Sequence, residues 1–177
     1  MNLNELASQV HQANIKWWTD IHTGIPISRN KGELLMMVIT ELAEAVEGIR
    51  KNLMDDKLPH RRMEEVEMAD GYIRLLDFAG GFQIALRFYP PSGNEVELVP
   101  DNKARAILEI CPHICRILER GLENESACVS FALFKIRNYC LKHHLDLDGA
   151  VTEKLAYNAT RHDHTHEARK ADGGKKF

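Results

Sequence analysis

Apolar residues recur along most of the chain at the three- and four-residue spacing that places them on one face of a helix. This pattern predicts helices over residues 4–20, 33–52, 61–79, 102–120, 125–144 and 148–160. Pro59 should stop the second of these helices, and Pro112 should kink or interrupt the fourth. The glycines of the sequence AGG should end the third helix. We therefore expect an all-α, bundle-like fold.

One segment departs from the helical pattern. Residues 80–101 contain FQIALRFY and EVELV on either side of PPSGN, a cluster of turn-forming residues. The pattern fits a hairpin of two short strands and, nearly as well, an irregular extended insertion. At the other end of the chain, residues 162–177 are polar, become basic, and have no apolar core of their own.

Composition narrows the class of protein. A length of 177 residues suits one domain, so residues 1–177 are treated as a single unit. The formal net charge of -3 argues against a dedicated nucleic-acid binder. No apolar run reaches the length of a membrane span, and the first residues, MNLNELASQV, lack the basic and apolar regions of a signal peptide. We expect a cytoplasmic protein that binds neither nucleic acid nor membranes.

The cysteines point to packing and not to chemistry. All four lie in apolar, helix-like segments, where reduced cysteines act as small buried hydrophobes. Cys111 and Cys115 share a helix face, but a zinc site needs more ligands, and His113 points elsewhere on a regular helix. We therefore interpret Cys111, Cys115, Cys128 and Cys140 as structural.

Two of the predicted helices carry acidic pairs at the same spacing. Glu41 and Glu44 lie one turn apart on the helix at 33–52, and Glu67 and Asp70 lie one turn apart on the next helix. The 22 residues between Glu44 and Glu67 are enough to end one helix and return antiparallel. A pair of solvated helix faces would also explain each pair, because acids three residues apart occur often by chance.

The residues around these acids favour a metal site. All four acids border an apolar stripe, and four facing carboxylates would repel one another unless a cation lay between them. A set of oxygen ligands favours Mg²⁺, or Mn²⁺ as a substitute, over iron or zinc. No glutamate has a histidine three residues later, which argues against a ferritin-like di-iron site. The remaining acids of this region are interpreted as surface charges or caps: Glu33, Glu47, Glu64, Glu65 and Asp77.

The last predicted helix offers polar groups suited to phosphate. Lys154, Asn158 and Arg161 fall on one helix face, where a cation, an amide and a guanidinium suit the oxygens of a polyphosphate. A polar surface stripe near a helix C-terminus is the simpler alternative.

Trp17 and Trp18 point about 100° apart on a helix, so one should be buried while the other is free to stack on a base. Asn14 lies one turn earlier and is a candidate for contacting a base edge, with core or surface roles as the simpler alternative for these residues. Arg29 and Asn30, just before the helix at 33–52, are similar candidates.

Taken together, ELAE, then EMAD after 22 residues, then KLAYNATR resemble the MazG-type members of the all-α nucleoside triphosphate pyrophosphatase superfamily. The basic, glycine-containing end GGKKF resembles the ends of phage and bacterial MazG-like proteins. The resemblance covers residues 28–80 and 145–177. Residues 83–143 look like an insertion into the compact form of that family, and residues 162–177 like a polar tail.

The resemblance implies cleavage of a nucleoside triphosphate between its α- and β-phosphates, which yields a nucleoside monophosphate and pyrophosphate. It implies Mg²⁺ ligands at Glu41, Glu44, Glu67 and Asp70, with Glu41 or Glu44 as general base. Lys154, Asn158 and Arg161 would hold phosphates, and Trp17 and Asn14 are the candidates for the base. A homodimer or homotetramer is implied as well. Two alternatives stay open: a catalytically silent helical interaction protein, and a hydrolase of another nucleotide such as an alarmone.

Overall fold

The computed structural model of the chain describes residues 2–119 and 122–174, and this part is helical without a β-strand. The all-α prediction is confirmed. The helix predicted over residues 4–20 is shorter than expected, because it ends at Asn14 and continues as one 3-10 turn. The elements are α1 (Leu3–Asn14), η1 (Ile15–Trp17), α2 (Lys31–Lys51), α3 (Met63–Gly81), α4 (Gly93–Glu97), α5 (Lys103–Leu108), α6 (Cys111–Glu119), α7 (Leu122–Lys142), α8 (Leu147–Thr160), η2 (His162–His164) and α9 (His166–Lys170).

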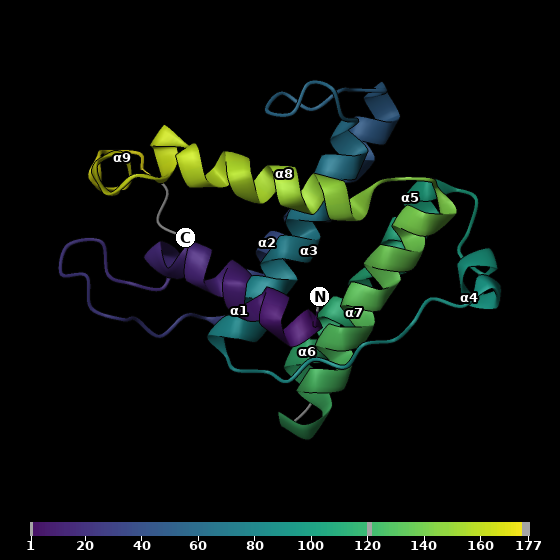
Figure 1. Cartoon of the computed structure of the whole chain (residues 1–177), viewed down its shortest axis with the longest axis horizontal. Helices are drawn as coiled ribbons and strands as arrows, with labels where there is room; N and C mark the ends of the chain where they lie inside the picture. Colours follow the sequence, from purple (N-terminus) through teal and green to yellow (C-terminus); the bar gives the residue numbers. More distant parts are fainter. Residues whose placement is uncertain (1, 120–121, 175–177) are drawn as a thin grey trace.

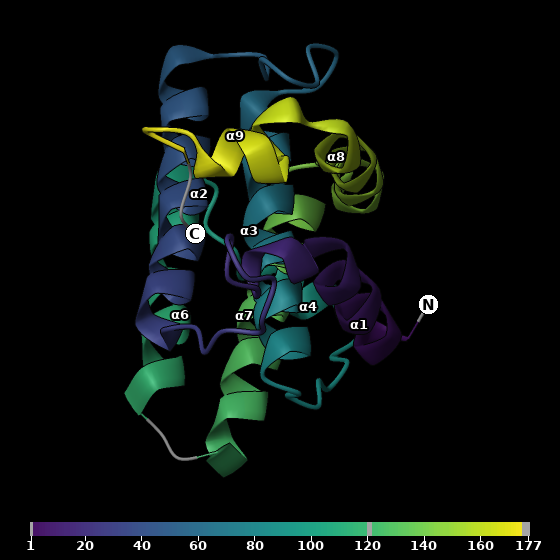
Figure 2. The same ribbon diagram turned by 90° about the vertical axis from the view of Figure 1, so that its left-hand side faces the viewer.

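Helix α3 lies at the centre of the fold and packs against α1, α2, α7 and α8 (Figures 1 and 2). Its sequence is apolar around most of its circumference, which is the pattern of a helix covered on several sides. Helices α2 and α3 run antiparallel, since Gly48 of α2 meets Met63 at the start of α3 while Val38 and Leu42 meet Gly71. This pairing brings the two acidic helix segments to the same level.

The ends of α2 and α8 have local sequence causes. The Asn30 side chain accepts a hydrogen bond from the backbone N–H of Glu33 at 3.1 Å, which caps the start of α2. Asn52 ends the same helix in the left-handed conformation, with φ 51°. Asp146 caps α8 by accepting from the N–H of Gly149 at 3.0 Å. These caps hold the helices that carry the candidate site at defined start and end points.

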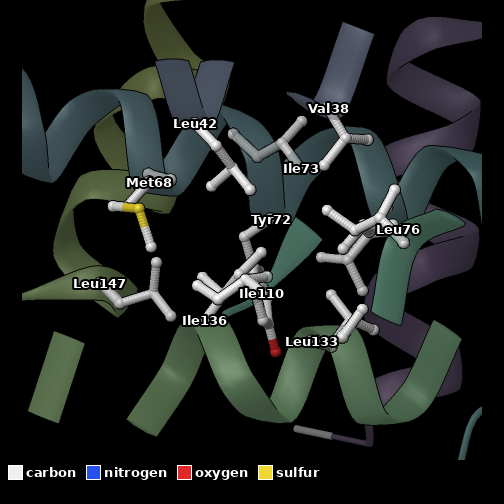
Figure 3. Close-up of a cluster of buried hydrophobic side chains, with 14 of the residues drawn as sticks. Val38, Leu42, Met68, Tyr72, Ile73, Leu76, Ile110, Leu133, Ile136 and Leu147 are labelled. Carbon is white, nitrogen blue, oxygen red and sulfur yellow. The ribbon is translucent and has the colours of Figure 1, made fainter. Parts of the chain in front are cut away.

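One continuous apolar core joins the elements. Figure 3 shows Leu42 of α2, Leu76 of α3 and Leu133 of α7 converging in it, and each of these side chains is at most 1% exposed. Ile110, from the turn between α5 and α6, and Leu147 of α8 enter the same cluster. The segment at 83–143 is therefore part of the main core and not a separate unit.

The two alternatives considered for residues 80–101 are now distinguished. After α3 ends, residues 84–92 run without a strand, and the short helix α4 follows, so no β-hairpin forms in this described segment. The helix predicted at 102–120 is divided into α5 and α6, as Pro112 suggested. Pro112 is the second residue of α6, where its missing N–H costs no helical hydrogen bond.

A buried glutamate ties this segment to the central helix. Glu64, in the first turn of α3, is 3% exposed and accepts hydrogen bonds from Tyr139 Oη at 2.6 Å and Lys103 Nζ at 2.7 Å. The interpretation of Glu64 as a surface charge or cap was wrong, because α7 covers the side of α3 on which this carboxylate lies. Helices α5 and α7 are thus both bonded to α3 one turn before Glu67.

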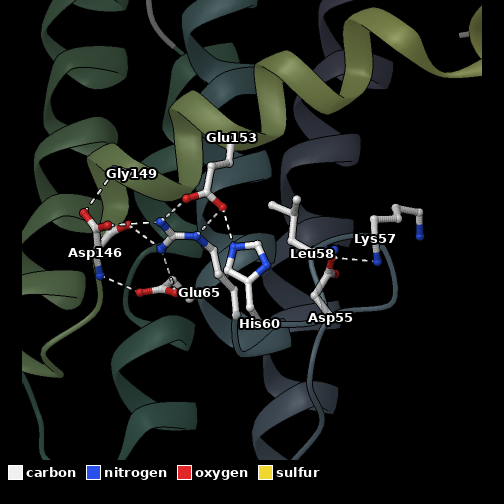
Figure 4. A network of polar contacts seen from close by, with 9 residues as sticks. Asp55, Lys57, Leu58, His60, Glu65, Asp146, Gly149 and Glu153 are labelled. Atoms are coloured by element: carbon white, nitrogen blue, oxygen red, sulfur yellow. Dashed lines mark hydrogen bonds and ion pairs between the residues drawn. The ribbon is translucent and has the colours of Figure 1, made fainter.

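A second polar cluster holds α8 against the start of α3. Figure 4 shows Glu65, Asp146 and Glu153 gathered where α8 crosses this turn. Arg61 binds all three carboxylates, at 3.0 Å to Glu65, 3.1 Å to Asp146 and 2.8 Å to Glu153. His60 bonds Glu153 from the same loop, at 2.7 Å. Glu65 is therefore a partly buried structural acid, and its interpretation as a surface charge or cap was also wrong.

The cysteines and the end of the chain differ in how far they are buried. All four cysteines are free, and Cys115 is exposed, whereas Cys140 is buried. Residues 162–170 form η2 and α9, and Arg169 is 2% exposed, so this part of the tail is packed. The basic residues at 175–177 lie outside the described residues. Within the described chain, no helix combines the length and the apolar character that crossing a membrane requires.

Helices α1 and α3 approach each other closely at Gly80. A Cβ on this residue would lie 2.6 Å from the backbone oxygen of Ala7 and 2.6 Å from the His11 Cβ. We expect Gly80→Ala to destabilise the fold by about 2 kcal/mol, because the clash involves backbone that must shift. Urea unfolding measures this change. Gly93→Ala is the matched control, since nothing lies within 4 Å of its Cβ position; equal stability of the two variants would contradict the prediction.

Candidate functional site

Three carboxylates from α2 and α3 come together. Oxygen atoms of Glu41, Glu67 and Asp70 all lie within 4.8 Å of one another. Glu67 is 6% exposed, and its Oε2 atom is buried without a hydrogen-bond partner among the described residues. A buried carboxylate oxygen without a donor is costly, so this atom is suited to receive a ligand. The arrangement results from the antiparallel pairing of the two helices at matched acidic turns.

The proximity of these acids changes their ionisation. Burial raises the pKa of Glu67 to about 9, and the negative charges of Asp70 and Glu41 act in the same direction. Burial raises the pKa of Asp70 to about 6, although the Lys154 ammonium opposes the change. Burial and the charge of Glu41 also raise the pKa of Glu44. Glu67 thus holds a proton at neutral pH that a bound cation would release.

Two cationic side chains contact the cluster. Arg74 Nε donates to Glu41 Oε1 at 2.5 Å. Lys154 Nζ, from α8, lies 2.7 Å from Asp70 Oδ2, and the Lys154 side chain is 3% exposed. These pairs attach α3 to α2 through Arg74, and α8 to α3 through Lys154. They leave Glu67 as the acid with the most strongly raised pKa.

The carboxylates form one wall of a cavity of about 440 Å³. The site residues predicted from the sequence all line it, Arg29 among them, with the exception of Asn30. The other lining residues come from several elements and include charged and apolar side chains. The full lining is Asn14, Trp17, Arg29, Leu34, Met37, Glu41, Glu44, Lys57, Glu67, Asp70, Ile73, Arg74, Asp77, Lys154, Asn158, Arg161 and His164.

The predicted phosphate-binding residues occupy the wall formed by α8. Asn158 Oδ1 is buried without a hydrogen-bond partner within the described chain. Arg161, which directly follows α8, forms two bonds to Asp163, with Nη2 2.6 Å from Oδ2 and Nε 2.8 Å from Oδ1. Lys154 is engaged by Asp70. The three residues therefore face one cavity, as their spacing predicted, but the two cations already have carboxylate partners.

The two tryptophans have different environments, as predicted. Trp18 is 7% exposed, and its indole N–H donates to Asp77 at 3.1 Å. Trp17 lines the cavity and makes an edge contact with His164, with ring centroids 5.1 Å apart. The Arg169 guanidinium lies 4.1 Å from the Trp17 ring centroid. One face of Trp17 is thus covered by α9, which the sequence did not indicate.

Several residues that line the cavity were not predicted from the sequence. Arg74 lies one turn after Asp70 on α3, so the i+4 spacing was the signal that could have identified it. Lys57 comes from the loop after α2, and no sequence pattern marked it. Asp77 was interpreted as a surface charge or cap, which was wrong: its carboxylate bonds His11 at 2.9 Å as well as Trp18, and burial raises its pKa.

The carboxylates fit a hard divalent cation. The donor set consists of oxygens alone, and one of them, Glu67 Oε2, has no donor within the described residues. Mg²⁺ and Mn²⁺ favour such oxygen donors. Glu44 lines the same cavity but is not among the three acids whose oxygens approach within 4.8 Å. No family model, curated protein or solved structure matched the chain in comparisons with known proteins.

Proposed function

We propose that the protein is a MazG-like, Mg²⁺-dependent nucleoside triphosphate pyrophosphohydrolase that converts (d)NTPs to (d)NMPs and pyrophosphate. The observation that carries the proposal is the single cavity in which acidic α2 and α3 residues face the cationic and amide groups of α8. Metal ligands on one wall and phosphate-binding groups on the other are what hydrolysis of a polyphosphate requires. A cavity of about 440 Å³ also lies within the usual range for small-molecule sites.

In this proposal Glu41, Glu67 and Asp70 hold the metal, with Mn²⁺ as a substitute. When bound, the ion supplies positive charge for phosphate oxygens and lowers the pKa of a coordinated water. Lys154 and Arg161 orient the phosphates electrostatically, and the Asn158 amide adds a hydrogen bond through its nitrogen. The Asn158 oxygen, which has no partner within the described chain, is suited to accept from a ribose hydroxyl or water.

Trp17 and Asn14 are proposed for the base and sugar end of the substrate. Both line the cavity together with the apolar side chains of Leu34 and Met37. Because Arg169 covers one face of Trp17, a nucleobase would contact the remaining surface of the ring. We include Arg29 in this group, since it lines the cavity and its Nη1 donates to the Trp17 carbonyl at 2.5 Å.

Glu44 is the better supported of the two candidates for general base. Glu41 is bonded to Arg74 and belongs to the three clustered carboxylates, whereas Glu44 faces the cavity one turn away. The pKa of Glu44 is raised and therefore lies closer to neutral pH than that of an ordinary glutamate, which favours general-base action. Glu44 would accept the proton of the attacking water, and the bond between the α- and β-phosphates would break with pyrophosphate as leaving group.

A substrate panel tests the function. Purified protein is incubated with each NTP and dNTP and Mg²⁺, and pyrophosphate is measured separately from orthophosphate. Pyrophosphate and nucleoside monophosphate in equal amounts are expected. Orthophosphate as the sole product would indicate a different cleaved bond, and no turnover together with no metal binding would favour the catalytically silent alternative. Inclusion of alarmones in the panel tests the second alternative.

Glu44→Gln separates the base from the metal ligands. We expect the variant to lose roughly a hundredfold in kcat, a typical value for a general base, while its affinity for Mn²⁺ stays close to that of the wild type. Glu41→Gln should lower both kcat and the affinity for Mn²⁺. Steady-state kinetics and Mn²⁺ titration measure the two effects. A Glu44→Gln variant that binds Mn²⁺ as poorly as Glu41→Gln would show that Glu44 is a ligand and not the base.

The wider proposal is removal of noncanonical or surplus nucleotides by a homodimer or homotetramer. Exposed apolar side chains on α2 and on the α5–α6 face, namely Met36, Leu108 and Leu118, are 59%, 67% and 54% exposed, and they support a contact between copies of the chain. Light scattering coupled to size exclusion tests the assembly, and a monomer would contradict it.

A further inference from the structure

The two cations that contact the carboxylate cluster differ in their freedom to move. The Lys154 side chain is 3% exposed, so separating it from Asp70 would leave two charges in the interior. The Arg74 side chain is 37% exposed. Its guanidinium can leave Glu41 and stay in contact with solvent, which makes the cost of release small. Of the two cations, Arg74 is therefore the exchangeable one.

The cavity is lined by equal numbers of acidic and basic side chains. Five carboxylates and five lysine or arginine side chains line it: Glu41, Glu44, Glu67, Asp70, Asp77, Arg29, Lys57, Arg74, Lys154 and Arg161. A divalent cation that enters alone must compete with these cations for the acids. A cation that enters with a polyphosphate brings the charge that the released cations need. Charge balance thus favours joint binding of metal and phosphate.

The position of Arg74 suits both the metal-free site and the site filled with metal and phosphate. It follows Asp70 by one turn on α3, and only its Nε bonds a carboxylate, since no other hydrogen bond of the guanidinium is found within the described part of the chain. Its two terminal nitrogens can bind adjacent phosphate oxygens as a planar fork. The same side chain can therefore neutralise Glu41 when the site is without metal and contact phosphate when the site is filled.

We propose that Arg74 is a displaceable counter-ion, which holds Glu41 until a divalent cation takes this carboxylate and then binds the phosphate oxygens of the substrate. The inference rests on the proposed function of the same site and adds a partner exchange to it. Its consequence is that metal and phosphate bind cooperatively. Arg74 weakens the binding of metal alone and strengthens the binding of phosphate once the metal is present.

Substitution of Arg74 should change the binding of metal and the binding of phosphate in opposite directions. Mn²⁺ titration, followed by electron paramagnetic resonance without nucleotide, should give an affinity about tenfold higher for Arg74→Gln than for the wild type, since a competing unit charge is removed. In a second titration with Mn²⁺ at saturation, Arg74→Gln should bind pyrophosphate about tenfold more weakly. Arg74→Lys, which keeps the charge, should resemble the wild type in the Mn²⁺ titration.

Arg50→Gln is the matched control. Arg50 lies on α2, is 68% exposed, and pairs with Glu47 on the surface, so both titrations should be unchanged. Equal or weaker Mn²⁺ binding by Arg74→Gln, with nucleotide turnover intact in the wild type, would overturn the exchange and leave the proposed function standing. Absence of Mn²⁺ binding in both the wild type and Arg74→Gln would overturn both.

Discussion

Glu67→Gln is expected to lower Mg²⁺-dependent pyrophosphate release roughly a thousandfold, about 4 kcal/mol of transition-state stabilisation. The same substitution should stabilise the protein in the absence of metal. Both effects have one cause, because burial, together with the charges of Asp70 and Glu41, raises the pKa of Glu67 to about 9. Glutamine is uncharged and similar in shape, so it removes the cost of the carboxylate and also its ability to bind a cation.

The stability effect has a definite pH dependence. Since the folded pKa of Glu67 is raised from 4.5 to about 9, its favourable contribution is complete below pH 4.5 and is lost as the pH rises toward 9. Between pH 4.5 and pH 7, this group alone should lower the stability of the metal-free wild type by on the order of 3 kcal/mol. Urea unfolding in EDTA at pH 5, 7 and 9 should show the wild type losing stability relative to Glu67→Gln.

Added Mg²⁺ should reverse the difference. Metal binding replaces the protons of the cluster, so the wild type should gain more stability from Mg²⁺ at pH 8 than at pH 6, and Glu67→Gln should gain little at either. Glu47→Gln on α2 is the control, because Glu47 is paired only with surface residues. A Glu67→Gln variant less stable than the wild type in EDTA at pH 8 would contradict the electrostatic account.

Lys154→Met is the substitution with the second large expected effect. It keeps an apolar stem but leaves Asp70 without its 2.7 Å partner, and we expect a loss of about 3 kcal/mol in stability at pH 8. The loss should be smaller at pH 5, because Asp70, whose pKa is raised to about 6, can then take up a proton. Denaturant unfolding in EDTA at the two pH values measures the difference.

A double-mutant cycle isolates the pair. Asp70→Asn combined with Lys154→Met should be more stable than Lys154→Met alone, because neither charge is then left buried without a partner. Turnover should be lost in all three variants. Additive losses of stability in the cycle would mean that the two residues do not interact, and would contradict the prediction.

The features that the sequence could predict are those that one helix determines by itself. The spacing of Glu41 to Glu44 and of Glu67 to Asp70 requires each pair to share a face, and a 22-residue separation permits an antiparallel return. The same reasoning placed Lys154 and Asn158 on one side of the last helix. Each of these residues lines the cavity.

The features that it could not predict depend on which elements meet. Glu64 and Glu65 are adjacent acids in the first turn of α3, a position where exposed acids are common. Their burial follows from α7 on one side and from Arg61 beside α8 on the other. Lys57 reaches the cavity from a loop whose course no helical period describes. The predicted β-hairpin does not form for a similar reason. Residues 84–92 pack against α7, where Ser130 Oγ accepts a hydrogen bond from the N–H of Arg87.

The two tryptophans make the candidate site visible to optical measurement. They are the only two in the chain, Trp17 lines the cavity, and Trp18 bonds Asp77, which lines it as well. Intrinsic fluorescence of the unlabelled protein therefore originates beside the region where ligands are expected. Emission can be followed while nucleotide is added to a slow variant such as Glu44→Gln, whose affinity for the metal is expected to stay close to that of the wild type, which allows binding to be measured apart from turnover.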